Sequence, residues 1–339
     1  MGELSFVVDK LLSGLVVGVD FDVPSGGPGT YLLFTVLSEA FPPFLDVYWS
    51  VVLFVRVAIS ALALELGRRV LPGLWTLLPL VCLLVAPGAL PSGFFMACTL
   101  LLTLACVHYL RAPGWRRALV LGLTVLVTGF VRLDMGAFGL LTTFVLCISS
   151  RERRPHLSFG ILPPLLALSL VLSWTTDLSA VLSPVLGQVW ADAVGTSGAQ
   201  AKSLVGPALV FFGLPLVVYG SLLVRWWRAG GLDPTPVVLV GLGFLTMKPW
   251  AGAPSFAGFL EGAPLLYFAV ALLLADLVSV GEATDESERL GTRRLWGALA
   301  IAMLLPAGLA AHTVVGHRGS LQTGSWTIPE GRTVALDTL

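Results

Sequence analysis

Long apolar runs separated by short polar loops constrain this chain more than any other feature of its sequence. Hydrophobic residues make up 56% of the chain, charged residues make up 12%, and the mean hydropathy is +0.90, unlike an average soluble domain. A helix needs roughly 17 to 25 apolar residues to cross a bilayer. The sequence therefore predicts an all-α fold, a polytopic membrane helix bundle of about ten transmembrane helices. The expected spans are approximately 46–68, 71–88, 91–110, 115–133, 136–150, 158–175, 204–226, 235–250, 262–280 and 293–315.

Arginine is concentrated in alternate loops, and this pattern sets the expected orientation of the bundle. Lys and Arg are retained preferentially on the cytoplasmic side of short loops. The arginine-rich loops should therefore face the cytoplasm, while both termini and the loop that carries Asp20 and Asp22 face outward. The clusters are Arg68 and Arg69; Arg111, Arg116 and Arg117; Arg151, Arg153 and Arg154; Arg225 and Arg228; and Arg289, Arg293 and Arg294.

Three parts follow from this topology: an outer segment 1–45, a transmembrane bundle 46–315 and an outer tail 316–339. An outer N-terminus is unusual here, because residues 1–19 have neither the basic segment nor the cleavage site of a signal peptide. We expect that a first membrane span preceded residue 1 and that the tail continued into an outer domain. The formal net charge is zero, which gives no indication of a nucleic-acid partner.

Two segments of the first 150 residues carry candidate chemistry. The run LLSGLVVGVDFDVPSGGPGTYLLFTVLSEAF, which begins at Leu11, contains Asp20 and then a Pro-Gly step at Pro28 and Gly29. After that step, an amphipathic helix along the outer interface is expected. The second segment, 129–136, is Gly-Phe-Val-Arg-Leu-Asp-Met-Gly. The apolar stripe of the expected helix comprises Tyr31, Leu32, Phe34, Leu37 and Phe41.

Both segments resemble polytopic membrane glycosyltransferases with the GT-C fold. The resemblance is greatest to the group that includes protein O-mannosyltransferases, aminoarabinose transferases and Rgt-like lipopolysaccharide glycosyltransferases. In that group a loop aspartate precedes a Pro-Gly step and a juxtamembrane helix, and an Arg-x-Asp-x-Gly pattern lies near an outer helix end. The resemblance implies a GT-C-like bundle that transfers a sugar, with inversion, from a polyprenyl-phosphate donor to an extracytoplasmic glycan, lipid or protein. The active site would face outward from the cell or inner membrane.

The chemistry of that reaction assigns roles to the residues. The acceptor hydroxyl must lose its proton as it attacks the anomeric carbon, and a nearby carboxylate can accept it. Asp20 is the expected base. The leaving phosphate needs cations to hold its charge. The expected substrate-binding residues are Asp22, Arg56, Arg132, Asp134 and Lys248.

The resemblance implies no metal and no other cofactor. Asp20 and Asp22 do form the DxD pattern that holds a divalent cation in some glycosyltransferases, but the sequence offers no identifiable third ligand. The family commonly has a histidine before a late helix, and segment 248–265 contains none. That departure leaves the contacts to the substrate phosphate open.

Other interpretations stay open. Asp20 and Asp22 are also typical of turn caps, Lys248 of an interfacial anchor, and the intramembrane charges of helix packing. A transporter or flippase for a lipid-linked or small polar substrate, with Arg56, Arg132 and Asp134 along its pathway, is one alternative function. An inactive, truncated paralogue is another. Charges gathered at one outer mouth favour an enzyme, whereas charges at midplane depth favour transport.

Overall fold

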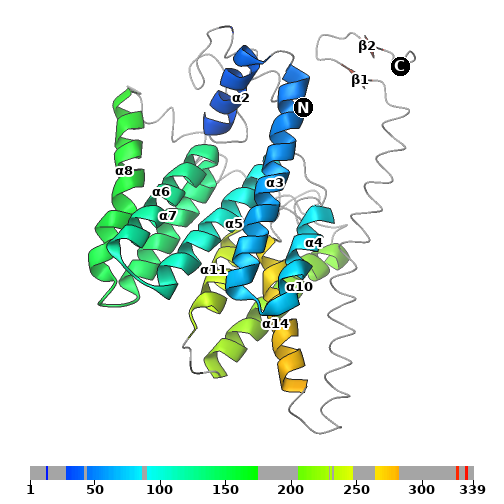
Figure 1. Ribbon diagram of the computed structural model, residues 1–339, viewed down its shortest axis with the longest axis vertical. Helices are drawn as coiled ribbons and strands as arrows, with labels where there is room; N and C mark the ends of the chain where they lie inside the picture. The colour runs from blue at the N-terminus through cyan, green and yellow to red at the C-terminus, as the bar shows by residue number, and fades with distance from the viewer. Residues whose placement is uncertain are drawn as a thin grey trace.

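The computed structural model describes Ser13 and residues 28–41, 44–85, 90–174, 205–228, 230, 233–246, 264–281, 326–327 and 333–334. Helices make up almost all of the regular structure in these ranges (Figure 1). The remaining regular piece described is a two-residue antiparallel strand pair, β1 (Trp326–Thr327) with β2 (Thr333–Val334). The predicted all-α fold class is confirmed.

Nine of the ten apolar runs form helices, and the tenth run, 293–315, lies outside the described residues. Two short 3-10 helices, η1 (Gly73–Thr76) and η2 (Arg154–His156), lie in loops at the starts of α4 and α8. The α-helices are α2 (Pro28–Ala40), α3 (Phe44–Val70), α4 (Leu77–Val85), α5 (Leu90–Arg111), α6 (Trp115–Val131), α7 (Leu133–Ile148), α8 (Leu157–Trp174), α10 (Val205–Arg228), α11 (Thr235–Thr246) and α14 (Pro264–Gly281).

Two of these helices are long and apolar enough to cross a membrane within the described part of the chain: Asp46–Val70 in α3 and Gly93–Arg111 in α5. They differ in burial, because the most apolar stretch of α5 is 78% buried and that of α3 only 33%. Phe54 of α3, for example, is 72% exposed. A helix that is both strongly apolar and largely exposed is unusual in a soluble domain. The structure therefore gives some support to a membrane protein, through α3 above all.

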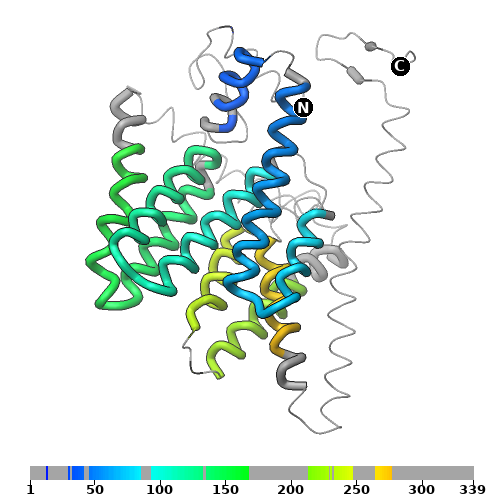
Figure 2. Tube along the Cα trace, viewed as in Figure 1, coloured from blue at the N-terminus to red at the C-terminus, as the bar shows by residue number. Residues whose placement is uncertain are grey.

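The bundle is built around α5. This helix packs against α3, α6, α7, α11 and α14, and its side chains form much of the hydrophobic core. Figure 2 shows α6, α7 and α8 as a group beside α5, while α10, α11 and α14 form a second group. Glycine permits close approach of α6 and α8: a Cβ on Gly122 would lie 2.5 Å from the carbonyl oxygen of Gly160.

The arginine-bearing ends of the helices gather at one end of the bundle, in the lower part of Figure 1. We call it the arginine end: it comprises the last turns of α3, α5, α7 and α10 and the first turns of α6 and α8. The opposite end, formed by the α6–α7 turn and the start of α2, is the turn end. Four of the five predicted arginine clusters thus lie at the same end, as the charge pattern predicts, and the fifth, Arg289, Arg293 and Arg294, lies outside the described residues.

Helix α2 begins at the predicted Pro-Gly step. Phe34 is fully buried, and its ring centroid lies 6.3 Å from that of Tyr48 on α3. Leu37 packs at the edge of the core. Phe41, however, is 65% exposed, because the helix ends at Ala40 and Phe41 follows it. The predicted apolar stripe is therefore confirmed at Phe34 and Leu37 and wrong at Phe41, and the side chains of Tyr31 and Leu32 lie outside the described part.

Candidate functional site

The connection between α6 and α7 is a single residue, Arg132, with extended backbone angles (φ −146°, ψ 117°). Its N–H donates to the Thr128 carbonyl at 2.8 Å, and its carbonyl accepts from the Gly136 N–H at 3.1 Å. The helices on either side of the turn almost touch. A Cβ on Gly136 would lie 2.7 Å from the Cα of Gly129. Two glycines seven residues apart therefore allow a reversal in which Arg132 is the single connecting residue.

The side chain of Arg132 lies against α5. Its guanidinium carbon is 4.7 Å from the ring centroid of Phe95, in cation–π contact. Such a contact contributes about 0.5 to 2 kcal/mol, most where the cation is shielded from water. Arg132 is half-buried while Phe95 is fully buried. The aromatic face therefore orients a cation at the turn end.

A hydrogen bond joins helix α2 to the same turn. Thr30, in its first turn, donates from Oγ1 to the carbonyl oxygen of Val131 at 3.2 Å. Val131 is the last residue of α6, where carbonyl groups have no partner within the helix, so this bond satisfies one of them. The chain that follows the Asp20 loop is thereby tied to the residue next to Arg132. The described part of the first segment, from Pro28 onward, therefore meets the second segment, 129–136, at the turn end.

Arg56 occupies the middle of α3 and is half-buried. Its carbonyl accepts a hydrogen bond from the Ser60 hydroxyl at 2.9 Å. The preceding residue, Val55, packs against α5, because a Cβ on Gly93 would lie 3.0 Å from its Cγ1. The first turns of α5 are thus flanked by α3 on one side and by the Arg132 turn on another.

The structure describes little of the other predicted site residues. Asp134 is the second residue of α7, next but one to Arg132, and its side chain is outside the described part. Asp20, Asp22 and Lys248 lie outside the described residues altogether. Among the residues that the structure does describe, no group of three or more His, Cys, Asp or Glu side chains is arranged to hold a metal ion.

Two contacts of this site carry little signal in the sequence. Phe95 is one aromatic residue inside an apolar run, and Thr30 is one hydroxyl in a turn. Neither stands out until the fold brings them to Arg132 and Val131. Gly129 and Gly136 are easier to recognise from the sequence, since small residues commonly permit close packing of helices.

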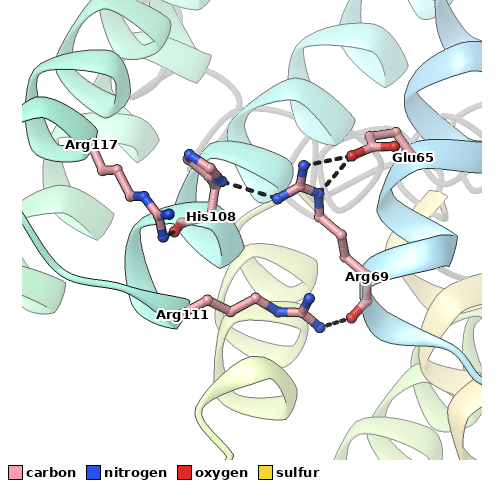
Figure 3. Close-up of polar contacts among 5 residues, drawn as sticks. All are labelled: Glu65, Arg69, His108, Arg111 and Arg117. Carbon is pink, nitrogen blue, oxygen red and sulfur yellow. Dashed lines mark hydrogen bonds and ion pairs between the residues drawn. The ribbon is translucent and has the colours of Figure 1, made fainter.

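A second polar cluster, at the arginine end, joins α3, α5 and α6 (Figure 3). Arg69 lies between Glu65, with Nε 2.7 Å from Oε1, and His108, with Nη1 3.0 Å from Nδ1. Arg117 donates to the His108 carbonyl at 3.1 Å, and Arg111 donates to the Arg69 carbonyl. These bonds occupy carbonyls and side chains at helix ends. We therefore interpret this cluster as structural.

Chemically, the turn end offers a half-buried guanidinium beside an aromatic face and the start of α2, and a guanidinium is suited to holding an anion. No protein-family model matches the chain, and no curated protein or solved structure matches it either. The geometry of the site and the resemblance of its two segments are therefore the basis for a function.

Proposed function

We propose that this chain is a polytopic membrane glycosyltransferase of the GT-C type. It transfers a sugar from a polyprenyl-phosphate donor to an extracytoplasmic acceptor, with Asp20 as general base. The observation that carries the proposal is the hydrogen bond from Thr30 to Val131, which joins α2 to the α6–α7 turn. It ties the segment after the candidate base to the candidate phosphate-binding Arg132.

The membrane setting rests on where apolar side chains are exposed. Helices α3, α6, α8 and α10 all present large apolar residues on their outer surfaces, beyond the core around α5. A soluble protein rarely exposes so many large apolar side chains on its helices, whereas lipid would cover them. Examples, all more than half exposed, are Leu53 and Val57 on α3, Val127 on α6, Leu162 on α8 and Val217 on α10.

The orientation follows from the two ends of the bundle. Arginines gather at one end, which in a membrane faces the cytoplasm. The turn end then faces outward, where polyprenyl-phosphate sugars and extracytoplasmic acceptors meet. Asp22 is six residues from Pro28, so chain geometry keeps its Cα within about 22 Å of the start of α2.

In the proposed reaction the acceptor oxygen attacks the anomeric carbon as Asp20 takes its proton. The bond between that carbon and the phosphate oxygen breaks, and polyprenyl phosphate leaves with the bonding electrons. Arg132, with Lys248 as a further cation, would stabilise the charge that develops on the phosphate. Asp22, Asp134 and Arg56 would line the substrate path.

The test is sugar transfer in membrane vesicles that contain the full chain. Polyprenyl phosphates carrying radiolabelled mannose, glucose or aminoarabinose serve as donors, and label in envelope glycan, lipid and protein is measured. We expect Asp20→Asn to lower the transfer rate by about 10²- to 10⁴-fold and Arg132→Gln by about 10²- to 10³-fold. Glu152→Gln and Arg228→Gln, exposed charges at the arginine end, are the matched controls. Equal transfer by wild type and Asp20→Asn would remove Asp20 as the base.

Transport is the second candidate, and the half-buried Arg56 in the middle of α3 favours it. The same vesicles distinguish the two functions. Movement of an unreacted lipid-linked sugar to the opposite leaflet, lost in Arg56→Gln but retained in Asp20→Asn, would support transport. Transfer that is lost in Asp20→Asn would support the enzyme.

A further inference from the structure

A group of exposed residues at the arginine end combines positive charge with an apolar strip. Trp115 and Arg116 open α6, and Arg151 and Arg154 lie in the connection from α7 to α8. Phe159 lies in the first turn of α8. We call these five residues the arginine–aromatic patch. None of them takes part in the proposed sugar transfer.

The aromatic half of the patch is well defined. The Trp115 and Phe159 ring centroids are 5.7 Å apart, and the Arg116 guanidinium carbon lies 5.3 Å from the Trp115 ring. Trp115 is nonetheless 49% exposed and Phe159 41% exposed. The close approach of α6 and α8 at their glycines holds the rings together. Indole rings with one wet face are typical of the membrane–water boundary.

Few carboxylates neutralise the arginines of the arginine–aromatic patch. Arg151 and Arg154 are exposed and, within the described part of the chain, form no ion pair with a carboxylate. Arg69 and Arg225, in contrast, are paired with Glu65 and Asp276. The connection that carries Arg151 and Arg154 contains one acid, Glu152, also exposed. The patch is therefore positive and suited to an external anion.

An apolar strip continues from the patch along α8. Phe159, Leu162 and Leu166 are spaced by three and four residues, so they share one face of the helix. All three are exposed, Leu162 and Leu166 by more than half. The strip extends about 10 Å from the charged end, because a helix rises about 1.5 Å per residue. A ligand that matches the whole surface has an anionic head and an apolar tail.

We propose that the arginine–aromatic patch binds an anionic phospholipid. The phosphate and headgroup lie between Arg116, Arg151 and Arg154, Trp115 and Phe159 flank the glycerol region, and an acyl chain follows Leu162 and Leu166. A free phosphate or an acidic peptide would leave the apolar strip uncovered. This inference shares only the membrane location with the proposed glycosyltransferase and needs none of its chemistry.

The test measures lipid retained by the purified full chain in detergent, by native mass spectrometry. Phosphatidylglycerol and phosphatidylcholine with identical acyl chains are titrated, and soluble glycerol phosphate serves as a competitor. The wild type should bind phosphatidylglycerol at least tenfold more tightly than phosphatidylcholine. Removing two charges in Arg116→Gln/Arg154→Gln should weaken phosphatidylglycerol binding about 30-fold, at about fivefold per arginine. Glycerol phosphate should compete poorly, because it lacks the tail.

The matched control is Arg68→Gln/Arg228→Gln, which removes two exposed arginines from the same end but outside the patch. It should change the affinity for phosphatidylglycerol by less than twofold. If both double variants lost the same affinity for phosphatidylglycerol, diffuse positive charge would explain the binding and the proposed site would be overturned. Equal affinity of the wild type for the two lipids would overturn it as well. Efficient competition by glycerol phosphate would mean a soluble-anion site instead. If the double variant does not fold, added salt must weaken phosphatidylglycerol binding to the wild type more than phosphatidylcholine binding.

Discussion

Substituting Gly136 with alanine tests whether the α6–α7 reversal depends on two facing glycines. The added methyl would lie 2.7 Å from the Cα of Gly129, whereas carbon atoms in good contact are about 3.5 to 4.0 Å apart. The neighbouring atom belongs to backbone, so no side chain can rotate away. One helix must shift by about 0.8 Å or more to restore that separation.

The magnitude follows from two opposing effects. Overpacking of this kind typically costs about 1 to 3 kcal/mol. Alanine regains about 0.5 to 1 kcal/mol over glycine inside a helix. The expected net loss for Gly136→Ala is therefore about 0 to 2.5 kcal/mol of unfolding free energy, centred near about 1 kcal/mol. Displacement of the turn should also loosen the contact between Arg132 and Phe95.

The assay is thermal unfolding in detergent. The control is the same substitution at a glycine whose added methyl has room. Gly241, inside α11, has no atom of another described element within 4 Å of its added Cβ. Gly241→Ala should raise the melting temperature slightly, whereas Gly136→Ala should lower it, at about 2 to 4 °C per kcal/mol. If both substitutions moved the melting temperature in the same direction by similar amounts, the close crossing at the turn would be refuted.

Two further changes test packing between other helices. The Tyr219 hydroxyl is buried without a partner among the described residues, so Tyr219→Phe should be neutral or raise stability by up to about 1 kcal/mol in thermal unfolding; a clear loss would reveal a partner for that hydroxyl. The pair between Arg225 and Asp276 joins α10 to α14 at 2.7 Å but is partly exposed, at 37% and 28%. A double-mutant cycle with Arg225→Gln and Asp276→Asn should therefore give a coupling energy of only about 0.2 to 1 kcal/mol, and strictly additive effects would show that the pair contributes nothing.

Hydropathy predicted the helices well where an apolar run coincides with one helix. The run 46–68 corresponds to α3, which begins and ends within two residues of it. The run 71–88 is divided, because Gly73 adopts a positive φ of 52° and a 3-10 turn precedes α4. The run 115–133 extends two residues beyond α6, since Arg132 leaves the helical conformation. Such breaks depend on backbone geometry that a hydropathy pattern does not register.

The sequence predicted the charged residue of the candidate site, Arg132, but not the aromatic ring that it contacts, Phe95. Arg132 stands out in the sequence because a charge in an apolar run is costly and therefore usually functional or paired. Phe95 lies 37 residues earlier among other apolar residues, and nothing local distinguishes it. Cation and ring meet only because α5 and the α6–α7 turn pack together in three dimensions.

The one-residue connection between α6 and α7 also bears on how the protein is made. If both helices cross the membrane, as in the proposed function, the one-residue connection prevents them from entering the bilayer one after the other, and α6 and α7 would insert together as a helical hairpin. In the proposed orientation the tip of that hairpin, Arg132, must be carried across the apolar interior, at about 2.5 to 3.5 kcal/mol for an arginine at midplane. Apolar residues throughout α6 and α7 offset that cost. In that orientation, membrane insertion would limit how many charges this turn can hold, independently of what the finished site binds.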